Sequence, residues 1–110
     1  MPTFITIGYG NEEGYQRTDE SVRTKAHAHD DWLKEGETRM GIAGTPTQVR
    51  NHGGTQVVVE SGPFMHSPLP IAGFAIIEPA DIEEAITMVS KTPCSVAYGV
   101  VELWPLQSNP

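Results

Sequence analysis

Three short runs of hydrophobic residues occupy consecutive positions, and this pattern constrains the fold more than any other feature of the chain. They are Val57-Val58-Val59, residues 74–77 and Val100-Val101. Successive side chains of a β-strand point to opposite faces of its sheet, so a strand with one wetted face alternates apolar and polar residues. These runs instead place apolar side chains on both faces. We therefore expect both faces of the predicted sheet to be covered.

Turn-forming residues divide the rest of the chain into predicted strands and helices. The run Asn51-His52-Gly53-Gly54 indicates a hairpin turn, and the prolines between Ser61 and Pro70 exclude regular structure there because proline lacks a backbone N–H. Residues 8–14 are expected to form a loop. The predicted elements are a strand at 4–7, a helix from Thr18 or Asp19 to about Gly36, a short strand at 40–43, a hairpin at 47–60, a strand at 73–78, a helix at 81–90 ended by Pro93, and a strand at 96–104 ended by Pro105.

This order predicts an α+β fold: a single domain, residues 1–110, with an antiparallel sheet, two helices on one face and an extra hairpin, in the ferredoxin-like arrangement. A chain of this length is long enough for one core and too short for two. Two helices can cover only one face of the sheet. The second apolar face therefore predicts a partner, most simply an identical chain packed sheet to sheet about a two-fold axis.

Composition narrows the class of protein and its partners. The chain is 38% hydrophobic and 19% charged, as in globular proteins, and it has no apolar run of the ~18 to 20 residues that a membrane span requires. Fourteen acidic residues against seven basic ones give a net charge of -7, which would repel nucleic acid. The N-terminus resembles no secretory signal, so we expect a cytoplasmic protein that binds neither membrane nor nucleic acid.

The segment 27–31 contains two histidines and two carboxylates, which are side chains that bind metals. On a helix, however, His29 points about 200° away from His27, so the two cannot bind one ion, and no metal is expected. We expect a solvated face with charge pairs, formed by His27, Asp30, Asp31 and Lys34. The single cysteine, Cys94, is interpreted as a packed residue. No phosphate-binding loop or dinucleotide fingerprint is present, so no cofactor is expected.

His29 lies on the predicted inner stripe of the first helix, together with Val22, Ala26 and Leu33. A histidine that faces a core needs hydrogen-bond partners for its ring nitrogens. One interpretation is a buried histidine bonded to the backbone. The other is a general acid or base that projects into a pocket beside the sheet, with its pKa set by burial. We take His29 as the candidate catalytic residue.

The segment Ser61-Gly62-Pro63-Phe64 is the second candidate site. Glycine supplies conformational freedom and proline fixes φ, so the segment predicts a rigid turn after a strand. Ser61 is not part of a G-x-S-x-G motif, so a serine nucleophile has no support. His66 either lines the same loop or is simply exposed. The candidate substrate-binding residues are Ser61, Phe64, Tyr9 and His66.

These residues also resemble a known family. The runs that carry the resemblance are 57–64, 72–78, the helix at 81–90 and the final segment 101–106. They resemble the YCII-related proteins, and most closely the branch with an Asp-Gly-Pro-Phe (DGPF) segment. The helix and exit loop of that branch are matched by His29, Leu33, Gly36, Gly41 and Pro46.

The resemblance implies a ferredoxin-like fold of the dimeric α/β barrel type, a dimer built by packing sheets, and a pocket with a histidine from the first helix. The few members with an assigned reaction include a lyase or dehalogenase that acts on a lactone. Ser61 stands where the branch has aspartate. Thr92-Pro93 stands where the other branch has the Asp-Pro whose carboxylate partners the histidine. The carboxylate is therefore missing at both places.

We hypothesise an acid/base enzyme, of the lyase or isomerase type, in which His29 moves a proton on a small carbonyl or lactone-like ligand. Two alternatives stay open. The missing carboxylate favours a non-catalytic ligand-binding or partner module, whereas a structural dimer would require only the apolar second face. In each case the expected partners are a second copy of the chain or an unknown small molecule.

Overall fold

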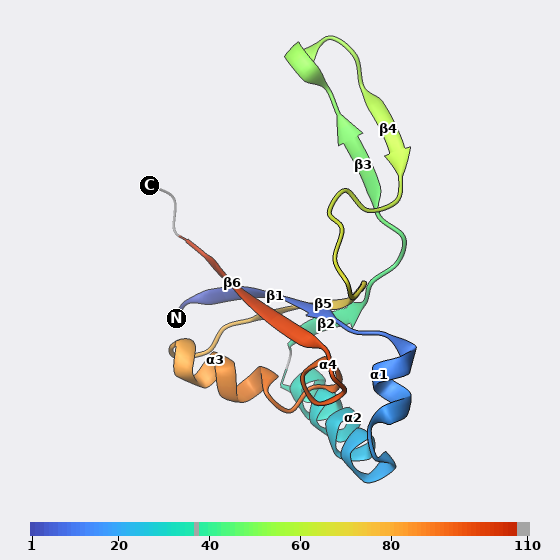
Figure 1. Cartoon of the computed structure of the whole chain (residues 1–110). Helices are drawn as coiled ribbons and strands as arrows, with labels where there is room; N and C mark the ends of the chain where they lie inside the picture. The colour runs from blue at the N-terminus through green and yellow to red at the C-terminus, as the bar shows by residue number, and fades with distance from the viewer. Residues whose placement is uncertain (37, 108–110) are drawn as a thin grey trace.

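The computed structural model describes residues 1–36 and 38–107, which form an α+β fold of four helices, a four-stranded sheet and a two-stranded sheet (Figure 1). The elements in chain order are β1 (Thr3–Tyr9), α1 (Glu12–Arg17), α2 (Glu20–Glu35), β2 (Arg39–Ile42), β3 (Thr47–Arg50), the 3-10 turn η1 (His52–Gly54), β4 (Val58–Ser61), β5 (Ile71–Ile77), α3 (Ile82–Val89), α4 (Pro93–Val96) and β6 (Val100–Leu106). The predicted α+β class is confirmed.

The main sheet has the strand order β2-β5-β1-β6, and every neighbouring pair is antiparallel. Its register places Phe4 of β1 opposite Ile77 of β5 and opposite Pro105 of β6. Across the described residues the sheet is open and does not close into a barrel. The predicted antiparallel sheet is therefore confirmed, with the first and third of its strands in the centre.

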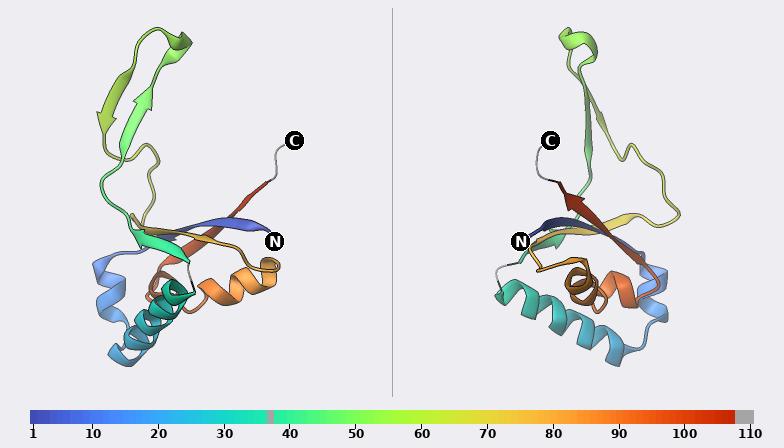
Figure 2. Two further views of the ribbon diagram at one scale, coloured as in Figure 1. Left: turned by 180° about the vertical axis from the view of Figure 1, so that it is seen from behind. Right: turned by 90° about the vertical axis from the view of Figure 1, so that its left-hand side faces the viewer.

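The helices lie on one face of this sheet (Figures 1 and 2). On this inner face Phe4 and Ile77 are buried and pack with Ala85 of α3 in the core. The helix α2 adds two further buried residues, Ala26 and Leu33. Alternation along the strands thus sends one set of side chains into a core that the chain covers with its own helices.

The two long helices begin and end where their capping residues predict. The side chain of Asp81 accepts a hydrogen bond from the backbone N–H of Glu84 at 2.9 Å, so α3 begins there. The backbone N–H of Gly36 bonds to the carbonyl oxygens of Trp32 and Leu33 at the end of α2. Within the described residues, no helix is long and apolar enough to cross a membrane.

Two short helices were not expected. The predicted loop at 8–14 contains the start of α1, because the side chain of Asn11 accepts a hydrogen bond from the Gly14 N–H at 2.9 Å and caps a helix. Pro93 does not merely end the preceding helix but begins α4, a position where its missing N–H costs nothing. The last strand consequently begins at Val100, and it continues through Pro105, which an edge strand tolerates.

The outer face of the main sheet carries no helix (Figure 2). Ile5, Ile76 and Trp104 form one row across three strands, and each is between 37% and 54% exposed. The neighbouring row contains Ile7 and Phe74. We call this surface the open face; its residues are Ile5, Ile7, Phe74, Ile76, Val100, Glu102 and Trp104. Its apolar character agrees with the consecutive hydrophobic residues of the strands.

The hairpin of β3 and β4 projects from the sheet on the side of the open face (Figures 1 and 2). We call residues 47–61 the arm. The arm makes the molecule elongated, with extents of 53 × 35 × 21 Å and a radius of gyration of 16.0 Å, against ~13 Å for a compact chain of this length. The predicted extra hairpin at 47–60 is therefore present, but it does not pack on the body of its own chain.

Candidate functional site

A cavity of about 510 Å³ lies between the inner face of the sheet and α2, beside α4. Its floor consists of small side chains, because the register pairs Gly8 with Gly73 and Thr6 with Ala75 at the centre of the sheet. Its walls come from both layers and are largely apolar, and α2 adds the polar residues His27, Asp30 and Lys34. The apolar lining includes Leu33, Met40, Ile42, Met88, Val89 and Val101. Pockets for small ligands commonly measure ~300 to 1,000 Å³, so this cavity has the size of a small-molecule site.

Two glycines keep this cavity and its surroundings open. A Cβ atom on Gly8 would lie 2.9 Å from Sγ of Cys94, so glycine at that position makes room for the thiol on the cavity wall. A Cβ atom on Gly73 would lie 2.8 Å from the carbonyl oxygen of Gly41 in the adjacent strand. The sheet therefore needs glycine at both positions for close approach of its neighbours.

Asp30 is the carboxyl group on the cavity wall, contributed by α2. Its Oδ1 atom is buried and has no hydrogen-bond partner among residues 1–36 and 38–107. The expectation that Asp30 belongs to a solvated, charge-paired face is therefore wrong for this residue. A buried polar atom without a partner costs free energy, so a ligand that would satisfy it is one explanation for Asp30.

The electrostatic surroundings of Asp30 favour proton transfer. Burial raises the pKa of its carboxyl group above the ordinary value, and the nearby charges of Lys34, His27 and His29 lower it by less. The group is therefore closer to exchanging a proton at neutral pH than a surface aspartate would be. Proton donors and acceptors in enzymes work best when their pKa lies near the working pH.

Cys94 shares this cavity but has no sign of nucleophilic activation. Burial raises the pKa of its thiol, and the negative charge of Asp30 raises it further. Thiolate, not thiol, is the reactive form of cysteine. The interpretation of Cys94 as a packed residue is thus the one that its surroundings favour.

His29 lies near a second cavity, which Trp32, Thr87 and Lys91 also line. Its Nε2 atom is 2.6 Å from the carbonyl oxygen of Met88, and its ring stacks on Trp32 with centroids 5.7 Å apart. A carbonyl oxygen only accepts, so Nε2 carries the hydrogen and Nδ1 is the nitrogen left for proton exchange in the neutral ring. The backbone-bonded histidine, one of the two sequence interpretations, describes this geometry.

The four residues predicted to bind substrate lie elsewhere. Ser61 ends β4, Phe64 is 73% exposed beyond it, and His66 is exposed in the following loop. The Tyr9 hydroxyl donates to Oε1 of Glu102 at 2.7 Å, on the outer side of the sheet. Among the described residues that line the two cavities, none of these four is present. Within one chain, the structure does not bring them together with His29.

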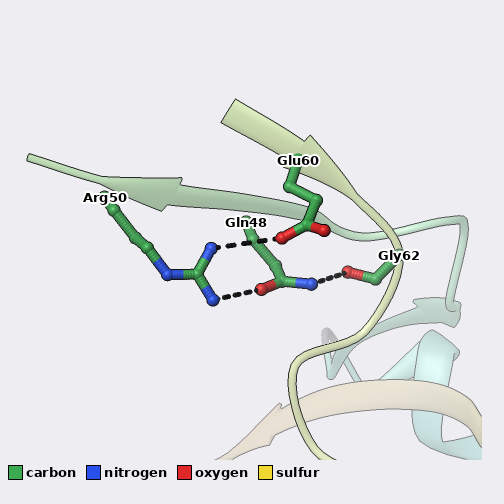
Figure 3. A network of polar contacts seen from close by, with 4 residues as sticks. All are labelled: Gln48, Arg50, Glu60 and Gly62. Atoms are coloured by element: carbon green, nitrogen blue, oxygen red, sulfur yellow. Dashed lines mark hydrogen bonds and ion pairs between the residues drawn. The ribbon is translucent and has the colours of Figure 1, made fainter. Parts of the chain in front are cut away.

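The turn predicted at Ser61-Gly62-Pro63-Phe64 is present and is held by a polar network at the base of the arm (Figure 3). Gly62 has a φ of 106°, which only glycine adopts readily. Its carbonyl oxygen accepts from Nε2 of Gln48 at 3.0 Å, and Arg50 bonds to Oε1 of Gln48 at 2.7 Å and to Glu60 at 3.4 Å. These bonds hold the base of the arm, where the chain enters β3 and leaves β4.

The sequence does contain a signal for Asp30 that the helical-stripe interpretation missed. Asp30 is four residues after Ala26 and three before Leu33, which are the two buried residues of α2.

Within residues 1–36 and 38–107, no group of three His, Cys, Asp or Glu side chains is placed to hold a metal ion. No family model matches the chain, and no curated protein matches it. The candidate site is therefore defined by its geometry.

Proposed function

We propose that this protein binds a small, largely apolar carbonyl compound, such as a lactone, in the cavity beneath the sheet, and that Asp30 exchanges a proton with it. The observation that carries this proposal is the buried Oδ1 atom of Asp30, which has no partner among the described residues and lies at the wall of a largely apolar cavity. A ligand with a hydrogen at that position would satisfy the atom. Perturbed carboxyl groups in cavities of this size are typical of active sites.

The chemistry that this arrangement supports is proton removal next to a carbonyl group. The ionised carboxylate of Asp30 takes a proton from the carbon beside the carbonyl, and the electron pair of that C–H bond forms a C=C bond. The carbonyl oxygen then becomes an enolate oxygen, for which the Lys34 ammonium on the same cavity lining is the available positive charge. Return of the proton to another carbon gives an isomerase, and loss of a neighbouring substituent gives a lyase.

His29 is the second candidate for the proton carrier, at the neighbouring cavity. Its free ring nitrogen, Nδ1, is the atom that would act. Asp30 and His29 are adjacent residues of α2, but Asp30 lines the first cavity and His29 lines the second. Asp30→Asn and His29→Ala therefore report on two different sites.

The test measures exchange of the α-protons of a panel of unsubstituted lactones with D₂O by NMR. We expect Asp30→Asn to lower the rate by ~100-fold or more, as for loss of a general base. The matched control is Asp31→Asn, because Asp31 is exposed on the same helix, and it should leave the rate unchanged. If His29→Ala lost exchange and Asp30→Asn kept it, His29 and not Asp30 would be the proton carrier. Saturable binding without any exchange would identify a non-catalytic ligand-binding module.

We also propose the ferredoxin-like arrangement and a homodimer across the open face, as the resemblance to YCII-related proteins implies. With the arm and the short helices α1 and α4 set aside, β1, α2, β2, β5, α3 and β6 follow the β-α-β-β-α-β order of that arrangement. The charge distribution supports the dimer. The strands contain two acidic residues, Glu60 and Glu102, and two basic ones, Arg39 and Arg50. The net charge of -7 therefore resides outside the strands, and the open face as defined contains one charged residue, Glu102, so two open faces can meet without strong repulsion.

A further inference from the structure

The two faces of the arm differ in polarity. The register pairs Val49 with Val59 on one face, and these side chains are 66% and 62% exposed. On the other face it pairs Gln48 with Glu60 and Arg50 with Val58, where the polar network of Figure 3 lies. A ribbon with a polar face and a bare valine face has the pattern of a strand pair that packs on one side.

The arm has little support from its own chain. Its strands β3 and β4 pair with each other and belong to no larger sheet. An isolated two-stranded hairpin is marginally stable in water and needs packing on another surface. The bare valine face therefore requires a covering surface that its own sheet and helices do not supply.

The accessible surface of the chain indicates how much area a partner could cover. The chain exposes 7972 Å², whereas a compact monomer of 12.0 kDa exposes ~6,000 Å². The excess is ~2,000 Å² per chain, or ~4,000 Å² for a pair. Obligate homodimers bury about 2,000 to 5,000 Å² in total. A dimer that covered this excess would therefore have an interface of obligate size, large enough to include the arm as well as the open face.

The direction of the arm indicates where its partner lies. The arm rises from the sheet on the side of the open face (Figures 1 and 2). Between Thr47 and His52 it spans ~17 Å, at about 3.3 Å per residue, whereas two packed sheets lie about 10 Å apart. A second copy seated on the open face would therefore lie beside the arm, and the tip of the arm would pass the plane of the second sheet.

From these observations we infer that the arm is a clasp between two copies of this chain, in which the face of Val49 and Val59 packs on the side of the partner and is buried there. The inference rests on the proposed homodimer, which places the partner beside the arm. It adds a second contact zone, formed by the arm, to the one formed by the open face. It also assigns a role to the turn at Gly62, which sets the angle at which the arm leaves the body.

Two substitutions at neighbouring positions of one strand test this inference. Val59→Asp places a charge on the valine face, and Val58→Asp places the same charge on the polar face, opposite Arg50. Both residues are exposed in the single chain, so neither change should unfold it. In sedimentation equilibrium we expect Val59→Asp to weaken dimerisation by ~100-fold and Val58→Asp by less than ~3-fold. Far-UV circular dichroism verifies that both variants fold.

A third variant, Phe74→Asp on the open face, separates the clasp from the dimer itself. If Phe74→Asp dissociates the dimer and Val59→Asp does not, the open-face dimer stands and the clasp is contradicted. Equal effects of Val58→Asp and Val59→Asp would also contradict the clasp, because the two faces would then not differ. A wild-type chain that is monomeric at millimolar concentration would contradict both the clasp and the dimer.

Discussion

The inner and outer faces of one sheet differ in what covers them. On the inner face Ile77 is 3% exposed and packs with Phe4 and Ala85, whereas its neighbour in the same strand, Ile76, is 44% exposed on the outer face. The strand supplies the same side chain to both faces. The difference therefore lies in the helices, which cover one face and leave the other for the proposed second copy.

The two faces also divide the roles that we propose. The inner face combines large side chains, which form the core, with Gly8 and Gly73, which leave room for the cavity of Asp30. The outer face carries large side chains on three of its strands, β5, β1 and β6. Under the proposed function and dimer, the chemistry belongs to the inner face and the assembly to the outer face together with the arm.

Adjacent isoleucines in β5 give the largest expected contrast between the two faces. Ile77→Ala should lower the free energy of unfolding by about 2 to 4 kcal/mol, because it leaves a cavity in a packed core. Ile76→Ala should cost less than about 1 kcal/mol in dilute solution, where its side chain is partly hydrated. Urea unfolding followed by circular dichroism measures both.

Protein concentration should affect the two isoleucine variants differently. If a second copy covers the open face, the cost of Ile76→Ala should increase with concentration, whereas the cost of Ile77→Ala should not. Equal costs for the two variants in dilute solution would contradict the division into a covered face and an open one.

Gly73 and Gly8 give the next largest effect. Gly73→Ala should destabilise the fold by about 1 to 3 kcal/mol, because its Cβ would meet the backbone oxygen of Gly41, which cannot move without shifting β2. Gly8→Ala should cost less, since its Cβ meets a side-chain thiol. Thermal unfolding measures both variants. The double variant Gly8→Ala/Cys94→Ala should recover most of that cost, and additive effects in this cycle would contradict the contact with Cys94.

Local signals in the sequence predicted the main elements but not the small ones. Asp81 and Gly36 mark helix ends because their capping bonds are made within a few residues. The helix α1 was missed because Asn11 and the glycines beside it are equally typical of a turn, and only the bond from Asn11 to Gly14 decides between the two. Pro93 was likewise interpreted as an end when it begins a helix.

The candidate site was harder to predict, since it depends on contacts between distant segments. The predicted inner stripe of α2 contained Val22, Ala26, His29 and Leu33; Ala26 and Leu33 are buried, whereas Val22 is 38% exposed. The small shift in helix orientation brings Asp30 to the cavity. That cavity exists because Gly8 and Gly73 pair across two strands 65 residues apart in the chain, which no local pattern reveals.

Asp30→Asn should have a smaller effect, and it should stabilise the fold. Because burial raises the pKa of this carboxyl group, its ionisation weakens the folded state as pH rises from the ordinary value of 3.8 through the raised one. The gain from Asp30→Asn should be absent near pH 3, below the ordinary value, and complete once the pH exceeds the raised pKa. It should stay below about 1 kcal/mol, because the residue keeps some contact with solvent.

The control for Asp30→Asn is the exposed neighbour Asp31→Asn, and thermal unfolding between pH 3 and pH 8 measures both. The control should show no comparable gain. A loss of stability in Asp30→Asn at pH 7 would mean that the carboxylate has a stabilising partner, which would contradict the site geometry. A gain in stability together with loss of proton exchange would show that Asp30 lowers the stability of the fold and is needed for its activity.

Glu102→Gln should have the smallest effect, confined to the ionisation of one phenol on the outer side of the sheet. The hydrogen bond to Glu102 raises the pKa of Tyr9 above 10.0, and the negative charge of the carboxylate adds to this rise. The same carboxylate also accepts from Trp104 Nε1 at 3.2 Å, and the two hydrogen bonds lower its own pKa. In a Tyr15→Phe/Tyr98→Phe background, ultraviolet titration reports Tyr9 alone, and Glu102→Gln should lower its pKa. An unchanged titration would mean that Tyr9 and Glu102 are apart in solution, so that the open face would be arranged differently from the row of side chains that the strand register defines.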